Sequence, residues 1–292
     1  MDYKKLDITT IPEVRPFLRY SGANTCDYTV GGIYMWRNFF DMQYAIEAGA
    51  YYSRLYDSCG NEYYNLPLSE NIEGSLIYLV QQLRKNKESI RFCTIPERFV
   101  PLFEKNFAIQ TIQAQPEYFD YLYATEDLVL LSGKKYRSQR NLISQFERTA
   151  GSWSFKEIRG EDIPAIRRFF LETCMAKQDD PIAGEEHQMV LEVLDHFESY
   201  GMIGGYLSVD DTIVGFSLGE LLQDTFFVHI EKANRSVKGA YQMLAQQMAI
   251  HFAKGKASFI NREEDMGDPG LKKAKEAYHP IEILRKYTIE VG

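Results

Sequence analysis

The sequence is poor in tryptophan and histidine and has no long apolar run. Its 292 residues include 2 Trp, 5 His and 4 Cys. No stretch approaches the ~20 consecutive apolar residues that cross a bilayer. The opening residues, MDYKKLDITTIPEV, lack the apolar core of a signal peptide. We therefore expect no transmembrane segment and, by default, a cytoplasmic location.

The cysteines and histidines do not form the patterns of common metal or nucleophile sites. The four cysteines include no CxxC pair, which argues against a zinc site and against a disulfide framework. The histidines show neither metal-ligand spacing nor a Ser or Cys partner in a triad-like motif. We therefore expect no metal, and the chemistry has to come from other residue types.

Charge is acidic overall but uneven along the chain. The formal net charge of −8 disfavours nonspecific binding of nucleic acid over the whole surface. Two segments are nevertheless rich in Lys and Arg, residues 133–148 and residues 272–286. Two local basic patches on an acidic protein suit one anionic ligand better than a long polyanion.

The second half of the chain gives the clearest pattern of helices and strands. Apolar alternation predicts strands, and apolar residues at helical spacing predict helices. The predicted strands are 152–160, 202–209, 212–221, 224–233, 257–261 and 281–291, and the predicted helices are 161–174, 185–201, 238–255 and a short one within 259–280. The resulting order, β-α-α-β-β-β-α-β-α-β, is shared with the GNAT N-acyltransferase fold.

The first half reads as a weaker copy of the second. Its predicted strands are 42–49, 50–56, 90–95 and 117–124, and its predicted helices are 72–86 and 96–107. The length also favours two domains. We therefore predict an α/β protein with mixed sheets in two tandem GNAT-like domains, residues 1–141 and 142–292. A helix over 142–152 would connect them, and the second domain would carry the site.

Four segments carry a resemblance to a known family. They are CDYTVGGIYMWRN (26–38), DLVLLSGKKYRSQRNLISQF (127–146), VHIEKANRSVKGAYQMLAQQMA (228–249) and FINREEDMGDPGLKKAKEAYHP (259–280). They resemble a bacterial family of uncharacterised proteins grouped with the C-terminal domain of phosphatidylglycerol lysyltransferases. The resemblance implies two tandem GNAT-like domains. It also implies kinship with enzymes that move an aminoacyl group from aminoacyl-tRNA to a lipid head group or, in the related Fem-type enzymes, to a peptidoglycan precursor.

The chain departs from the usual GNAT pattern at the turn that binds coenzyme A. Ordinary GNAT enzymes cradle the pyrophosphate of acetyl-CoA with backbone amides of a Q/R-x-x-G-x-G/A turn at a helix N-terminus. Here Lys238 takes the place of the first glycine, and Gly239 comes one place late. A plain helix start explains the two residues equally well. The departure favours aminoacyl-tRNA as the donor, with acetyl-CoA as the weaker alternative.

The basic segment before residue 146 is a candidate anion site. If the helix begins near Tyr136, Arg137 and Arg140 share one face, where they can grip a phosphate or carboxylate. A solvated basic turn is the alternative. The predicted binding residues of this segment are Lys134, Lys135, Arg137, Arg140 and Asn141.

The stretch 259–280 brings acidic and basic groups together after a short strand. Asp268 reads as a helix N-cap and Pro269 as the first helical residue. Lys275 borders the apolar stripe of this helix, and a buried lysine needs an acidic partner. A charge-satisfied pocket is therefore favoured over a solvated loop. The predicted binding residues of this pocket are Lys232, Asn261, Arg262 and Asp265, and Lys238 and Gly239 are the predicted binding residues of the turn before the helix 238–255.

These residues predict acyl transfer, most favourably of an aminoacyl group to an amine or hydroxyl acceptor. Glu231 or Glu263 would accept the proton of the acceptor, and Lys275, Arg262 or Tyr278 would stabilise the anionic intermediate. His229 lies two residues before Glu231 on one strand, so the pair could transfer protons, although a satisfied core histidine is equally common. The competing class is a non-catalytic module that binds an anionic metabolite.

Overall fold

The computed structural model describes residues 1–174 and 181–292, which form two compact units. Unit 1 contains Met1–Asp120, Glu264–Asp268 and Ile283–Gly292. Unit 2 contains Tyr121–Glu263 and Pro269–Glu282. Each unit is built on a mixed sheet of seven strands. Within the described ranges, no helix is both long enough and apolar enough to cross a membrane.

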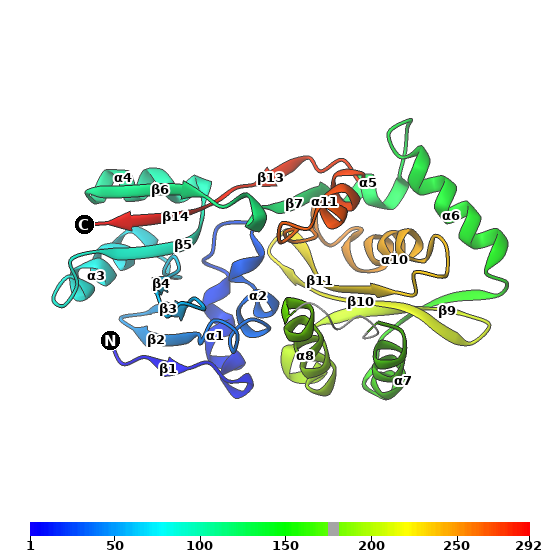
Figure 1. The fold of residues 1–292 in the computed structure, drawn as a ribbon, viewed down its shortest axis with the longest axis horizontal. Coiled ribbons are helices and arrows are strands. Elements are labelled where there is room, and N and C mark those ends of the chain that lie inside the picture. Colours follow the sequence, from blue (N-terminus) through cyan, green and yellow to red (C-terminus); the bar gives the residue numbers. More distant parts are fainter. Residues whose placement is uncertain (175–180) are drawn as a thin grey trace. The chain divides into compact units, whose positions relative to one another are not determined.

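The sheet of unit 1 takes its strands from both ends of the chain. In spatial order they are β1 (Lys4–Lys5), β2 (Gln43–Glu47), β3 (Ala50–Tyr56), β4 (Glu62–Tyr64), β5 (Ile90–Pro96), β14 (Lys286–Val291) and β6 (Ile109–Ala114). β4 and β5 are parallel, and β14 is antiparallel to β5 and to β6. Figure 1 shows β14, in red, between these two strands.

The sheet of unit 2 has the corresponding arrangement. Its strands are, in order, β13 (Glu282–Leu284), β7 (Asp120–Ala124), β12 (Phe259–Asn261), β11 (Thr225–Ala233), β10 (Thr212–Leu222), β9 (Ile203–Val209) and β8 (Trp153–Glu157). β11 and β12 are parallel, whereas β7 is antiparallel to β12. The predicted hairpin of β9 and β10 is confirmed, since Val209 pairs with Thr212.

The predicted boundary between residues 141 and 142 differs from the observed division. The chain leaves unit 1 at Asp120, because β7 completes the sheet of unit 2 by pairing with β12. It returns for the last strand, because β14 pairs with β5 and β6. Pairing between strands distant in sequence decides these two of the crossings between the units, and local apolar patterns do not report it.

The helix expected to connect the domains lies inside unit 2 as α6 (Arg137–Thr149). Its buried side chains are Gln139, Ile143 and Phe146, a spacing that gives one apolar face. This face packs against α10 (Ala240–Met248), which itself covers the sheet. The core between them includes Tyr123, Phe226 and Leu244.

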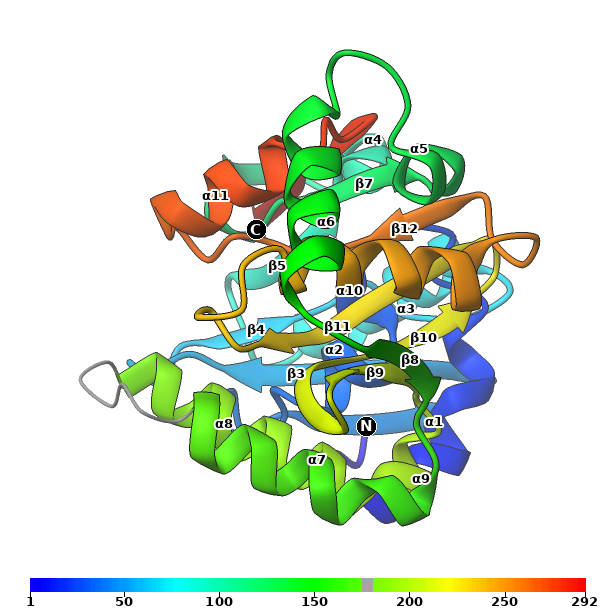
Figure 2. The ribbon, with the colours of Figure 1, turned by 90° about the vertical axis from the view of Figure 1, so that its right-hand side faces the viewer.

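Helices cover both faces of the sheet in unit 2. α6 and α10 lie on one side and α7 (Ile163–Phe169) and α8 (Pro181–Asp195) on the other (Figures 1 and 2). α7 and α10 each continue into a π-helical turn, Phe170–Cys174 and Ala249–Ala253 respectively. The remaining helices of unit 2 are α5 (Thr125–Leu130), α9 (Phe197–Tyr200) and α11 (Pro269–Glu276).

Unit 1 has four α-helices in the described part of the chain. They are α1 (Ile11–Leu18), α2 (Val30–Tyr34), α3 (Ile72–Leu83) and α4 (Val100–Asn106). Side chains fix two of their starts: Thr29 accepts a hydrogen bond from Gly32 N, and Asn71 accepts one from Gly74 N. Of these helices, α3 and α4 were predicted, whereas α1 and α2 were not, and neither were β1, β4, β6 and α5.

Candidate functional site

The candidate site of unit 2 lies where β11 and β12 part. Thr225–Phe227 of β11 pair with Phe259–Asn261 of β12, and β12 then ends while β11 continues to Ala233. The residues directly after β12 therefore turn past the second half of β11. This geometry brings Arg262 and Glu263 to the side chains of β11.

Arg262 forms a buried ion pair with Glu231. Arg262 Nη2 lies 2.7 Å from Glu231 Oε1, and both side chains are 14% exposed. Burial alone would lower the pKa of Arg262, but the Glu231 charge outweighs it and raises the pKa, so the guanidinium stays charged. Its carbon lies 4.7 Å from the centre of the Tyr278 ring, a cation–π contact. Of the four charged groups predicted to lie within salt-bridge reach of one another, Glu231 and Arg262 do pair, whereas Glu263 contacts His229 and Lys275 binds the Arg262 carbonyl.

The ion pair with Glu231 uses only one terminal nitrogen of this guanidinium, Nη2. Arg262 Nη1 is buried and has no hydrogen-bond partner among the residues that the structure describes. Arg262 and Glu231 also border a cavity of about 10 Å³, roughly the space of one water molecule. Its other walls are apolar: Leu128, Phe226, Val228, Ala245, Met248, Ala249 and Ile260. An oxygen atom of a ligand or a water can therefore satisfy this donor.

Lys275 is buried as predicted, and it braces the turn after β12. Its ammonium donates a hydrogen bond to the backbone carbonyl of Arg262 and lies 5.7 Å from the centre of the Tyr121 ring. Tyr278 is buried too, and burial raises the pKa of its hydroxyl to about 12. Tyr278 is therefore protonated at neutral pH.

His229 contacts two carboxylates. Its Nδ1 lies 2.6 Å from Glu263 Oε1, and its Nε2 lies 2.9 Å from Glu220 Oε1. The predicted pairing of His229 with Glu231 is wrong, because Glu231 turns to Arg262 while Glu220 and Glu263 occupy the two ring nitrogens. The sequence analysis missed Glu220. The sequence offered one indication of its role, because Glu220 is the acidic residue in the predicted strand 212–221.

Glu263 is held in an uncommon backbone conformation. Its φ is +58°, in the left-handed region that residues other than glycine rarely adopt. Asn261 supports this turn by accepting a hydrogen bond from Glu263 N at 2.6 Å. The Glu263 side chain is 23% exposed, more than the other members of the His229 cluster. Such local strain clusters at functional sites.

The basic segment before α6 is engaged largely in local contacts. Lys135 pairs with Asp127 at 3.0 Å, and Arg140 donates to the carbonyls of Leu131 and Gly133. Lys134 and Arg137 are exposed. The shared face predicted for Arg137 and Arg140 is therefore not an anion grip, and a binding role for the segment remains a prediction.

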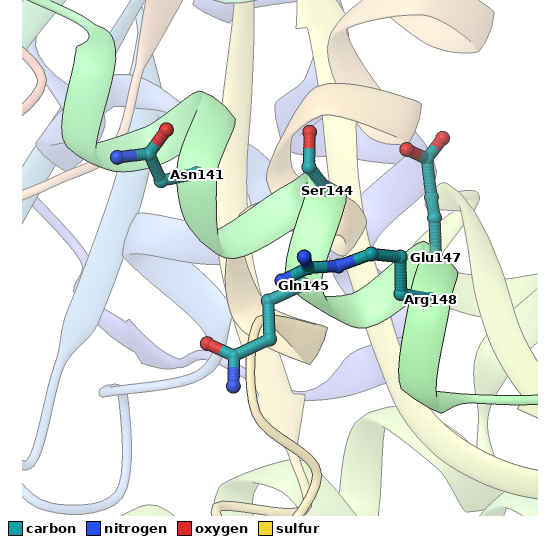
Figure 3. A pocket seen from close by; sticks show the side chains of 5 residues that line it. All are labelled: Asn141, Ser144, Gln145, Glu147 and Arg148. Carbon is teal, nitrogen blue, oxygen red and sulfur yellow. The ribbon is translucent and has the colours of Figure 1, made fainter.

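A surface hollow of about 560 Å³ lies along α6. It is lined by Asn141, Ser144, Gln145, Glu147 and Arg148. Figure 3 shows that all five side chains come from this one helix. Asn141 is the predicted binding residue among them. The converging charges of the candidate site lie instead at the end of β12.

The turn at the start of α10 has a structural explanation. Gly239 has φ +85°, and a Cβ atom there would lie 2.2 Å from the carbonyl oxygen of Leu142 in α6. The glycine is therefore required for close packing of two helices. Lys238 is exposed, and Lys232 pairs with Glu186 at 2.5 Å. Their predicted ligand roles stay predictions.

A second buried cluster lies in unit 1 and was not predicted. Lys286 Nζ lies 2.7 Å from Asp120 Oδ1 and 2.8 Å from Asp27 Oδ2. Cys26 donates its backbone N–H to Asp120 and its thiol to Glu264. The ligand atoms of Cys26, Asp27 and Asp120 are close enough to hold a cation, and the Lys286 ammonium already supplies one.

Asp265 also lies in unit 1, where its carboxylate accepts a hydrogen bond from Gly267 N at 2.9 Å. It was expected in the same pocket as Arg262. The chain crosses to unit 1 between Glu263 and Glu264, so Asp265 belongs to a different unit from the Arg262 site.

Comparisons with known proteins agree with this fold. A conserved protein of unknown function from Bacteroides thetaiotaomicron VPI-5482 has 28% identity and a TM-score of 0.90, with all of both chains covered. L-PGS from Bacillus licheniformis has 14% identity and a TM-score of 0.65, covering 95% of this chain and 90% of that one. FemX has 8% identity and a TM-score of 0.62, covering 98% and 97%.

The predicted fold class, α/β with mixed sheets, is confirmed by the two seven-stranded sheets. The chain belongs to the family described as phosphatidylglycerol lysyltransferase, C-terminal, whose profile matches residues 18–290. An uncharacterised protein of Mycoplasmoides gallisepticum is 26% identical over 178 residues. That match spans 59% of this chain and 56% of the relative.

Proposed function

We propose that the protein is an aminoacyltransferase that moves an aminoacyl group from aminoacyl-tRNA to an amine or hydroxyl acceptor such as a lipid head group. The observation that carries the proposal is the pair of consecutive residues after β12. Arg262 offers a buried, unpartnered nitrogen, and Glu263 offers a fixed and partly exposed carboxylate. Transfer of an ester needs one group of each kind.

The proposed reaction uses these two side chains in sequence. Glu263 takes the proton of the acceptor amine or hydroxyl as the acceptor's electron pair forms a bond to the ester carbonyl carbon. The carbonyl oxygen becomes an oxyanion, and Arg262 Nη1 donates a hydrogen bond to it. The bond from the carbonyl carbon to the ribose oxygen then breaks, and Glu263 returns its proton to that oxygen. The products are the acylated acceptor and uncharged tRNA.

Glu231 and Tyr278 would keep Arg262 in place during this reaction. The ion pair holds Nη2, and the Tyr278 ring covers one face of the guanidinium. Nη1 is left without a hydrogen-bond partner among the described residues. A donor that is fixed before the reaction stabilises charge better than one that has to reorganise.

The packing at Gly239 supports a donor other than acetyl-CoA. In ordinary GNAT enzymes, the glycines of this turn let a pyrophosphate approach the backbone. Here the carbonyl of Leu142 makes the close approach instead. The exposed Lys134 and Arg137 then offer charges to tRNA phosphates, a contact that we include in the proposal.

The test is a transfer assay with the purified chain. Total tRNA charged with radiolabelled amino acids is supplied at low salt with phosphatidylglycerol vesicles, and acetyl-CoA with an amine acceptor is supplied in parallel. We expect a labelled lipid product that falls about 10²-fold or more in Glu263→Gln. The matched control, Glu276→Gln on the exposed surface of α11, should leave the rate unchanged.

Two results would redirect the proposal. Turnover of acetyl-CoA, with none of aminoacyl-tRNA, would make the protein an N-acetyltransferase. Saturable binding of either donor without any covalent product would instead favour the non-catalytic module that binds an anionic metabolite.

A further inference from the structure

His229 is placed by an irregularity in the sheet. Along the β10–β11 ladder, Leu218 pairs with Ile230 and Gly219 pairs with Val228, so His229 is the extra residue of a β-bulge. A bulge turns a side chain away from the regular alternation, and bulges are frequent beside active sites. The His229 side chain is fully buried.

Hydrogen bonds from His229 to two ionised carboxylates require both of its ring nitrogens to be protonated. An ionised carboxylate only accepts hydrogen bonds, and neutral imidazole has a single N–H. With Glu263 at one nitrogen and Glu220 at the other, only the imidazolium can donate to both. Burial alone would lower the pKa of His229, but the two carboxylates outweigh it and raise the pKa to about 10.

The three side chains form a row from the interior to the surface. Glu220 is 6% exposed, His229 is 0% exposed, and Glu263 is 23% exposed. Glu220 is therefore too deep to touch an acceptor, whereas Glu263 can. The contact of Glu220 with His229 links it to the reaction through the imidazolium.

We propose that Glu220 is a positioning residue, which holds His229 in its doubly donating form and thereby fixes the Glu263 carboxylate toward the acceptor. The inference rests on the proposed function of Glu263 as the proton acceptor. Without Glu220, a buried imidazolium keeps one carboxylate only and loses its proton more easily. The Glu263 side chain then loses the donor that orients it.

The first test reads His229 directly and needs no substrate. Protein labelled with ¹⁵N at histidine is titrated by NMR. In the wild-type protein both ring nitrogens of His229 should be protonated at pH 8, and in Glu220→Gln the ring should lose its proton at least about tenfold more readily. Glu220→Asp keeps the negative charge and should retain the protonated ring. Glu157→Gln, an exposed residue of β8, is the control and should match the wild-type protein.

The second test is a double-mutant comparison in the transfer assay. Glu220→Gln should lower kcat in the wild-type background and should have no further effect in Glu263→Gln, because its influence passes through that carboxylate. An additional loss of the same size in both backgrounds would show a merely structural role and overturn the inference. A neutral His229 at pH 7 in the wild-type protein would overturn it as well, even if the transfer assay succeeds. If no donor gives product, the proposed function fails, and the NMR titration still decides whether Glu220 controls His229.

Discussion

Replacing Lys286 with methionine should strongly destabilise the protein. Lys286 is 1% exposed and holds the carboxylates of Asp27 and Asp120 at 2.8 and 2.7 Å. Glu264 adds a third acid, since it accepts the thiol hydrogen bond of Cys26. Three acids thus share one ammonium, and methionine keeps the volume of the lysine chain but removes its charge.

The magnitude follows from the burial of this cluster. Breaking a buried ion pair by removing one partner costs about 3–5 kcal/mol, because the remaining charge is left without compensation. Unit 1 contains a matched exposed pair, Lys105 and Glu73, with the same 2.8 Å separation and side chains 68% and 37% exposed. Lys105→Met should cost less than about 1 kcal/mol.

The loss should depend on pH. In the wild-type protein the pKa of Lys286 is raised, because the nearby acids outweigh the effect of burial, so its contribution is complete below about pH 10. In Lys286→Met, Asp27 loses the cation that lowers its pKa, so the pKa of this carboxyl, which burial already raises, rises further. A carboxyl with a raised pKa destabilises the fold progressively above its unfolded pKa near 4. The free energy of unfolding lost in Lys286→Met should therefore be smaller at pH 5 than at pH 8.

Urea unfolding followed by circular dichroism at these two pH values measures the effect. Adding Asp120→Asn to Lys286→Met should recover part of the lost stability at pH 8, because it removes one uncompensated charge. The reasoning is refuted if Lys286→Met and Lys105→Met cost the same, or if the deficit does not change between pH 5 and pH 8.

Three further predictions concern unit 2. Gly239→Ala should lower the free energy of unfolding by more than Gly255→Ala, because both glycines have positive φ but only Gly239 meets a backbone atom; equal losses would contradict this. Lys275→Ala should cost about 1–3 kcal/mol by urea unfolding, since a buried carbonyl loses its donor, whereas Lys273→Ala on the exposed face should cost about zero. The raised pKa of His229 contributes stability that is complete below about pH 6.5 and is lost as pH rises toward 10. The stability that a His229→Asn variant lacks relative to the wild-type protein should therefore shrink across this interval. A stability difference that stays constant with pH would count against the imidazolium.

The sequence alone indicated the elements of the second half and several members of the site. β9, β10 and α10 follow from short-range periodicity, which a local pattern records directly. The meeting of Glu231 with Arg262 could be predicted, because the two residues lie at the ends of strands that were expected to be neighbours. The burial of Lys275 was predicted too, although the buried stripe assumed for its helix was partly wrong, because Leu271 and Ala274 are exposed.

Tertiary structure alone decided the partners of the charged groups and the course of the chain between the units. A one-residue β-bulge places His229 in contact with Glu220 and Glu263, whereas Glu231 pairs with Arg262. A bulge depends on how two strands pair, and the composition of either strand alone does not reveal it. β7 and β14 joined sheets whose other strands lie far away in sequence, so Asp120 and Lys286 met in one buried cluster. Hydrogen bonding between strands is indifferent to sequence separation, and for that reason periodicity predicted these strands but not their neighbours.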